Sequence, residues 1–165
     1  MGVLSESLSL QLQLLFPLLV AALLGGLVGW EREGPRRGAG LRTHMLVGVS
    51  AALFVELAGQ MIRLYLSVGG GVRFDLAGVL GAVVSGVSFL GAGTIFFAGP
   101  ERGTRGLTTA ASLLSTAGVG VACGLELFVL AGGATLLFLF ILRPLHAVER
   151  RWLARVRDDG PGMPD

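Results

Sequence analysis

Long apolar runs separated by short polar segments divide the chain into five predicted membrane spans. The runs cover residues 8–30, 45–66, 77–98, 107–124 and 125–142. A helix rises about 1.5 Å per residue, so runs of this length suit a hydrocarbon core of about 30 Å. The pattern therefore predicts an all-α bundle of five transmembrane helices over residues 1–142, followed by a basic tail over residues 143–165.

The span at 77–98 is unusual because small residues recur in it at helical spacing. They form two rows with a step of four: Gly78, Ala82 and Gly86, and beside them Gly81 and Ser85. Such a row lies on one face of a helix and lets a neighbouring backbone come close. We therefore expect this span to be the central helix of the bundle, with the other spans packed against it.

Small residues also line one face of the span at 107–124. They are Thr108, Ser112, Thr116, Gly120 and Gly124, again four residues apart. This face is expected to meet the central helix or a second copy of the chain, and the small-residue faces together predict a homodimer. In the first span, Gly25 and Gly29 form a further pair suited to close packing.

The positions of the arginines predict the orientation. All 13 basic residues are arginine, with four in 31–44, two in 99–105 and five in 143–165, against only Arg63 and Arg73 on the opposite side. Positive charge concentrates in cytoplasmic loops, so the N-terminus is expected outside and the C-terminus in the cytoplasm.

Within the tail, apolar residues recur every three or four positions: Leu145, Val148, Trp152 and Val156. This spacing predicts a short amphipathic helix on an anionic membrane surface.

Composition narrows the class of protein. With 53% hydrophobic residues and a mean hydropathy of +0.76, the chain is too apolar for a soluble domain. The single cysteine, Cys123, excludes an intrachain disulfide and a multi-cysteine metal site. The two histidines, His44 and His146, lie too far apart in sequence to predict a metal pair. There is no phosphate loop, nucleophile elbow or zinc-protease motif, so neither an enzyme nor a nucleic-acid partner is expected.

Four stretches in order carry a family resemblance. They are residues 26–33 (GLVGWERE), 39–48 (AGLRTHMLVG), 84–95 (VSGVSFLGAGTI) and 105–112 (RGLTTAAS). Together they resemble the MgtC/SapB family of bacterial inner-membrane proteins. The resemblance implies a multi-pass protein of the bacterial inner membrane that is linked to magnesium homeostasis. Many relatives also continue into a cytoplasmic C-terminal domain, which this chain is expected to lack.

The resemblance has gaps at the start of the span at 77–98. The family pattern has Asp-Pro-x-Arg here with a glutamine four residues later. This chain keeps Asp75, but Leu76, Gly78 and Ala82 stand at the proline, arginine and glutamine places, and Ser88 replaces a glycine. These departures affect any polar site at the outer start of this span.

Two acidic residues are the candidates for a cation or proton site. Glu56 is the one acid well inside a predicted span, where an ionised side chain is costly unless it faces protein or water. The alternative for Glu56 is a neutral, hydrogen-bonded acid or a partner for Arg63. Asp75 matches the family's aspartate and is the candidate for magnesium, held as a largely hydrated ion, while its alternative is a helix N-cap.

The arginine-rich side suggests an anion site instead. Two spans begin with similar chemistry, one at Arg42 and Thr43, the other at Arg105, Thr108 and Thr109. Free N–H groups at helix starts, hydroxyl groups and arginine favour a phosphate-like group such as a lipid headgroup. The alternative is that the arginines only set topology and the threonines cap helices.

These observations leave two functions open. The first is a membrane protein of magnesium or cation homeostasis, with cation transport as its most direct form. The second is a non-transporting regulatory protein that acts on a membrane partner, such as an ATP synthase or a transporter, or binds an anionic lipid headgroup.

Overall fold

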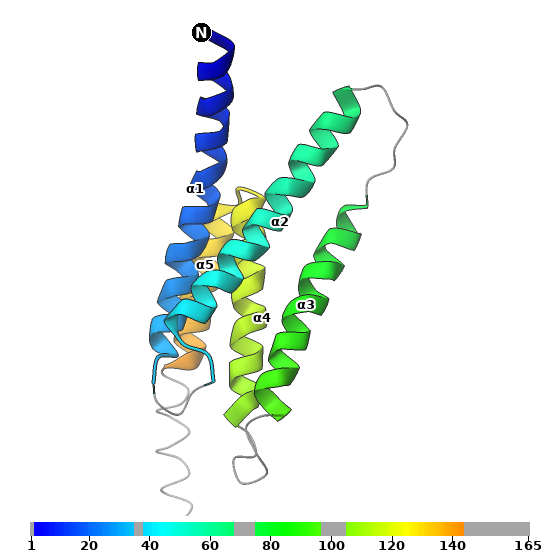
Figure 1. The fold of residues 1–165 in the computed structure, drawn as a ribbon. Helices are drawn as coiled ribbons and strands as arrows, with labels where there is room; N and C mark the ends of the chain where they lie inside the picture. Colours follow the sequence, from blue (N-terminus) through cyan, green and yellow to red (C-terminus); the bar gives the residue numbers. More distant parts are fainter. Residues whose placement is uncertain (1, 35–37, 68–74, 97–104, 144–165) are drawn as a thin grey trace, which may run out of the picture.

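The computed structural model describes residues 2–34, 38–67, 75–96 and 105–143 of the 165 residues. In these ranges the chain forms five α-helices and no strand (Figure 1). The helices are α1 (Gly2–Glu31), α2 (Leu41–Ser67), α3 (Leu76–Phe96), α4 (Arg105–Gly124) and α5 (Phe128–Leu142). The all-α prediction is confirmed, and the predicted amphipathic helix of the tail lies outside the described residues.

Four of the helices are long and apolar enough to cross a membrane. They are α1, α2, α3 and α4, whereas α5 is apolar but has only 15 residues. α1 begins before the predicted span at residue 8 and runs unbroken through Pro17, while α5 begins three residues after the predicted start at 125. Membrane-spanning helices of this kind place the chain among multi-pass membrane proteins.

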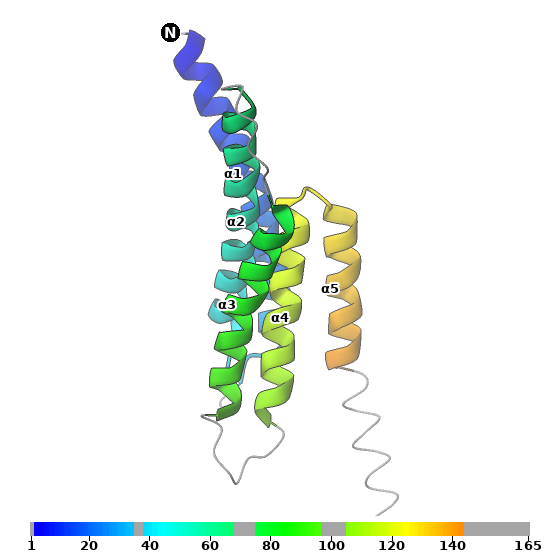
Figure 2. The ribbon, with the colours of Figure 1, turned by 90° about the vertical axis from the view of Figure 1, so that its right-hand side faces the viewer.

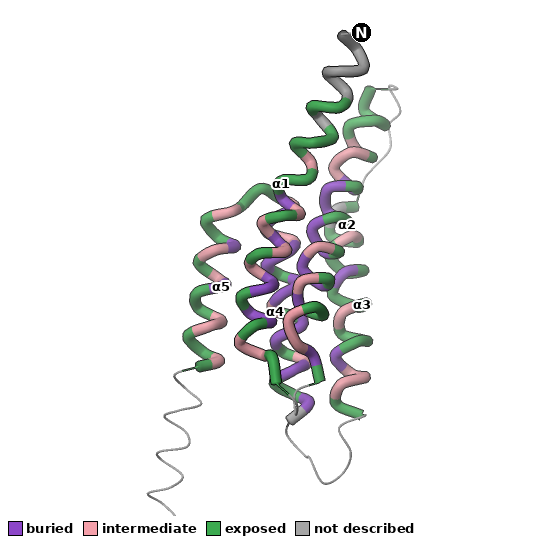
Figure 3. Tube along the Cα trace, turned by 60° about the vertical axis from the view of Figure 1, so that its left-hand side comes forward, coloured by how far each residue is buried: buried purple, intermediate pink, exposed green. Residues whose placement is uncertain are grey.

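The centre of the bundle is α4, so the expectation that α3 is the central helix is wrong. α4 packs against all four other helices and lies between α3 and α5 (Figure 2). Within its spanning segment 56% of the residues are buried, compared with 11% for α3. Most of α3 is exposed in the tube coloured by burial (Figure 3). A row of small residues permits a close helix contact, but it needs a matching surface on a neighbour, and within the described part of the chain no atom lies within 4 Å of a methyl group added at Gly81 or Gly86.

The core is a seam in which three rows of mainly small residues meet. Each row has four residues at a step of four, and eleven of the twelve are buried, with Gly124 intermediate: Pro17, Ala21, Gly25 and Gly29 on α1, His44, Gly48, Ala52 and Glu56 on α2, and Ser112, Thr116, Gly120 and Gly124 on α4. We call this set the three-helix seam. Side chains without bulk let the backbones of the three helices touch, which is how helices associate where lipid removes the hydrophobic driving force.

Glycine is required at several points of the seam. A methyl group in place of the Gly25 hydrogen would lie 2.8 Å from the carbonyl oxygen of His44. One at Gly29 would lie 2.7 Å from the Cα of Leu41, and one at Gly120 would collide with the carbonyl oxygen of Gly48. These contacts are to backbone atoms that cannot turn aside, so the α1–α2 and α2–α4 pairs are held at minimum separation.

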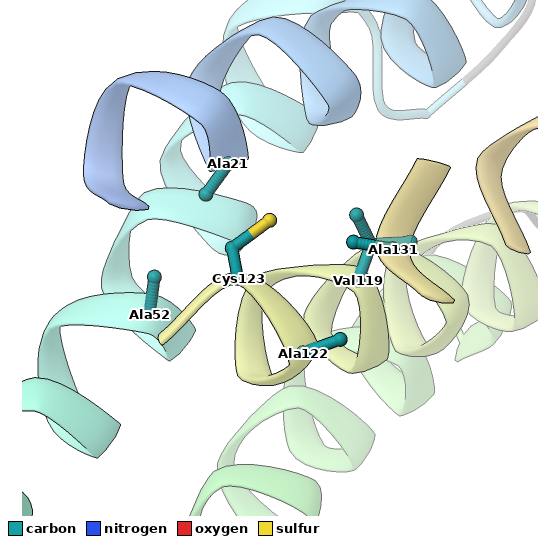
Figure 4. Packing of buried hydrophobic residues seen from close by; sticks show 6 residues of the cluster. All are labelled: Ala21, Ala52, Val119, Ala122, Cys123 and Ala131. Carbon is teal, nitrogen blue, oxygen red and sulfur yellow. The ribbon is translucent and has the colours of Figure 1, made fainter. Parts of the chain in front are cut away.

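α5 completes the bundle on the side away from α3. Cys123 of α4 is fully buried between Ala21 of α1, Ala52 of α2 and Ala131 of α5 (Figure 4). The α4–α5 connection is tight: the N–H of Leu127 donates to the carbonyl of Ala122 at 2.8 Å, and Glu126 takes φ 59°. This is the hydrogen-bond pattern that commonly ends a helix, with glutamate at the position where glycine is usual.

Candidate functional site

A buried polar cluster lies where α1, α2 and α4 meet, at the end of the bundle at which α2 begins. Its centre is His44, whose side chain is fully buried. Nδ1 of His44 lies 2.8 Å from the carbonyl oxygen of Gly40, and because a carbonyl only accepts, Nδ1 carries a proton. Nε2 lies 3.1 Å from Oγ of Ser112, which is itself 2.8 Å from the carbonyl oxygen of Thr109. The imidazole therefore joins α2 to α4 through hydrogen bonds at both of its nitrogens.

Hydroxyl groups and one arginine surround this cluster. Thr109 is 2% exposed, and its Oγ1 accepts a bond of 3.4 Å from a guanidinium nitrogen of Arg32 at the end of α1. Thr116 is fully buried and donates to the carbonyl of Ser112 at 2.9 Å. The hydroxyl groups of Thr109, Ser112 and Thr116 therefore each have a hydrogen-bond partner, as burial requires.

The other titratable group of the seam is Glu56, at the opposite end of the α2 row. It is 7% exposed, and its Oε1 is buried with no hydrogen-bond partner in the described part of the chain. One turn further on α2, Nε2 of Gln60 is also buried and has no partner there. Glu126, in the α4–α5 turn, and Arg63 are the charged groups that act on Glu56 electrostatically. The buried position is the one expected for a proton or cation site, and the role itself stays a prediction.

Asp75 lies in a different setting from Glu56. It is exposed and directly precedes α3, and its carbonyl accepts the N–H of Val79 at 3.4 Å. Its carboxylate leans over the first turn, since a methyl group on Gly78 would lie 2.9 Å from Oδ2. This is the position of a helix N-cap, and no described contact joins Asp75 to Glu56.

The described residues do not build a cage for a bare magnesium ion. No three histidine, cysteine, aspartate or glutamate side chains among them lie close enough together to hold a metal. Magnesium needs about six oxygen ligands and keeps its water readily. Asp75 alone could bind only a magnesium ion that keeps most of its water ligands.

The start of α2 is already capped by a carboxylate of the same chain. Oε2 of Glu33 accepts the N–H of Leu41 at 2.5 Å. Arg42 and Thr43 are exposed and, with Trp30 and Glu33, line a hollow of about 720 Å³. An external anion at this helix start would compete with Glu33 for the same N–H group.

The residues expected at the second helix start do not all join the first set. Thr109 points inward and binds Arg32, whereas Thr108 is exposed. Arg105 begins α4, and its side chain lies outside the described part of the structure. No described contact brings Arg42 or Thr43 together with Thr108 or Thr109, so convergence of the five on one anion stays a prediction.

The predicted packing residues divide between two environments. Ser112, Thr116 and Gly120 are buried in the three-helix seam. The α3 set is exposed: Gly78, Gly81, Ala82, Ser85 and Gly86. A methyl group added at Gly81 or Gly86 would meet no atom within 4 Å. Ala82 and Gly86 border an apolar groove of about 860 Å³ between α2 and α3.

Sequence reasoning missed His44, Gln60 and the pairing of Arg32 with Thr109. The missed signal is the α2 row itself, in which His44, Gly48, Ala52 and Glu56 stand four residues apart. A histidine and a glutamate at the two ends of a small-residue row lie on a packed face, where burying a polar group costs free energy unless the group has a partner. A pattern of paired histidines does not identify the His44 cluster, because the partners of His44 are hydroxyl and carbonyl groups.

The fold and the buried polar groups define the class first: a multi-pass α-helical membrane protein with a histidine and a glutamate, His44 and Glu56, in its packed core. The comparison with known protein families then identifies the family within this class. Residues 18–151 match the MgtC family model, so the chain belongs to the MgtC family.

Named relatives agree with this assignment. The chain is 44% identical over 131 residues to a protein named Protein MgtC from Brucella abortus (strain 2308), covering 78% of this chain and 50% of the relative. It is 43% identical over 131 residues to Protein MgtC from Salmonella typhimurium (strain LT2), covering 76% and 51%. The chain thus spans about half the length of the curated relatives it matches. No solved structure matches the chain.

Proposed function

We propose that this protein serves magnesium or cation homeostasis in the bacterial inner membrane by regulating a membrane partner, and does not conduct ions through its own core. The observation that supports this is the closed middle of the three-helix seam. Between the His44 cluster and Glu56, Gly120 touches the Gly48 carbonyl, and a methyl group on Gly124 would lie 2.7 Å from the carbonyl oxygen of Ala52. Backbones in contact leave no width for a hydrated ion.

A second candidate, cation transport, is favoured by one observation. Glu56 presents a buried carboxylate oxygen with no partner in the described part of the chain. Buried acids in membrane segments are typical of proton and ion pathways. Transport by this route requires the seam to open between Glu56 and His44.

Ion flux separates the two candidates. Purified protein would be reconstituted into sealed liposomes that contain indicators for magnesium, potassium or protons, with an ionophore as positive control. We expect no flux above that of protein-free liposomes. Flux that is saturable, and that Glu56→Gln or Asp75→Asn abolishes, would overturn the regulatory proposal in favour of transport.

Growth tests the link to magnesium separately. A bacterial strain that lacks its own MgtC-family gene would be complemented with this chain and grown in limiting magnesium. We expect the chain to restore growth although it shows no flux. Failure to restore growth, with the protein present in the membrane fraction, would refute the homeostasis role itself.

A further inference from the structure

The hydrogen bonds around His44 form a chain whose two ends are carbonyl oxygens that only accept hydrogen bonds. It runs from the Gly40 carbonyl through the two ring nitrogens of His44 and Oγ of Ser112 to the Thr109 carbonyl. The chain has three links, of 2.8, 3.1 and 2.8 Å. Since neither carbonyl can donate, His44 and Ser112 must supply every hydrogen in these links.

Counting hydrogens distinguishes two states of this chain. A neutral imidazole and a hydroxyl supply two hydrogens for the three links. With Nδ1–H bound to Gly40, the Ser112 hydroxyl can donate either to Nε2 or to the Thr109 carbonyl, but not to both. An imidazolium and a hydroxyl supply three hydrogens, so that Nε2–H donates to Ser112 and the hydroxyl donates to Thr109.

We propose that His44 is a buried proton-binding site at the junction of α1, α2 and α4, and that the Ser112 hydroxyl reverses its direction when the proton binds. A proton from water adds to the Nε2 lone pair, and a new N–H bond forms there. No hydrogen bond of the imidazole is lost in either state. The site needs neither ion transport nor a partner protein, so it goes beyond the function proposed above.

The surroundings allow the proton to arrive and hold the ring in place. His44 lies in the first turn of α2, next to the end of the bundle, so a proton crosses little protein to reach it. Gly25 and Gly29 of α1 pack against its backbone and Cβ, and the hydrogen bonds at Nδ1 and Nε2 hold the ring. The proton therefore changes the hydrogen-bond direction and not the position of the imidazole.

The charged groups around His44 come from the ends of α1 and α5, from the segment that follows α1, and from α2. Arg32 faces the cluster from the end of α1 and bonds Thr109. Glu33, in the segment after α1, bonds the N–H of Leu41, and Arg42 on α2 itself is exposed. Glu31 pairs with Arg143 at the end of α5, and the described side chains of α4 near His44 are hydroxyls. No described carboxylate bonds the imidazole, so Ser112 is the acceptor on which the charged form depends.

Nitrogen NMR of the ring tests the proposal directly. The full chain, labelled with ¹⁵N-histidine and carrying His146→Asn, would be titrated in lipid nanodiscs, so that His44 is the one remaining histidine of the two. We expect the neutral form to carry its proton on Nδ1, and Nε2 to gain a proton on acidification while the helical circular dichroism is unchanged. A neutral form protonated on Nε2, or no protonation before the helices unfold, would overturn the proposal.

Ser112→Ala supplies the matched test of the relay. An imidazolium N–H left without an acceptor costs more than a neutral nitrogen left without a donor. Ser112→Ala should therefore weaken proton binding about tenfold, a shift of about one pH unit downward. Ser115→Ala on the same helix is the control and should not move the midpoint, because Ser115 makes no described bond to His44. Equal midpoints in the two variants would refute the role of Ser112, and if Ser112→Ala does not fold, the titration of His44 still decides the proposal.

Discussion

The α4 and α3 rows of small residues look alike in sequence but differ in the structure. Ser112, Thr116 and Gly120 are buried against α1 and α2, whereas Gly81 and Gly86 face open space. The difference lies in the neighbours, because the α4 row meets rows on two other helices that are small at Ala21, Gly25, Gly48 and Ala52. Small side chains thus make a helix able to pack closely, and a complementary surface decides whether it does.

We expect the largest effect from a substitution in the buried α4 row. Gly120→Leu places a side chain against the carbonyl of Gly48, which belongs to a backbone that cannot move without separating α2 from α4. We expect destabilisation of more than about 3 kcal/mol, or loss of the folded protein. Unfolding in detergent, followed by circular dichroism and gel filtration, measures it.

Gly118→Leu is the matched control on the same helix. Gly118 is exposed, and a methyl group there would meet nothing within 4 Å. We expect a change within about 1 kcal/mol, because the new side chain enters lipid and leucine is a better helix former than glycine. Comparable losses from Gly118→Leu and Gly120→Leu would contradict the position of the seam.

The next largest effect is expected from substitutions in the exposed α3 row. If the exposed α3 row forms the contact of the predicted homodimer, Gly81→Leu and Gly86→Leu should leave the fold of one chain intact. Association should weaken by about 1–2 kcal/mol, or about tenfold or more in the dissociation constant. Single-molecule counting of labelled subunits in vesicles at varied protein-to-lipid ratios reports the change. Unchanged association would move the dimer contact away from α3.

The smallest effect is expected for the ion pair between Glu31 and Arg143, which we call the rim of the bundle. Nε of Arg143 pairs with a carboxylate oxygen of Glu31, joining the ends of α5 and α1, but the Arg143 side chain is 66% exposed. Arg143→Ala should therefore cost less than about 1 kcal/mol. Thermal unfolding measures the loss, and the exchanged pair Glu31→Arg with Arg143→Glu should recover part of it. A loss as large as that of Gly120→Leu would show that the rim stabilises the fold as strongly as the seam.

The hydrophobic pattern was sufficient to predict the all-helical membrane fold, because long apolar runs have few stable alternatives in lipid. The central helix was assigned wrongly, since the spacing within α3 carries no information about its neighbours. Burial of Glu56 followed from its place inside a span. The His44 cluster did not, because its bonds join residues 68 positions apart, and only the packing of α2 against α4 brings them together.

The shortness of α5 has a consequence for the surrounding lipid. At about 1.5 Å per residue, its 15 residues cover about 22 Å, well below a hydrocarbon thickness of about 30 Å. Beside α5 the bilayer must thin, or headgroups and water must dip toward one of its ends, at Glu126 or at Arg143, to avoid leaving polar groups in acyl chains. Lipids with shorter tails accommodate this hydrophobic mismatch with less deformation, so membrane thickness becomes a variable to which one flank of the protein responds.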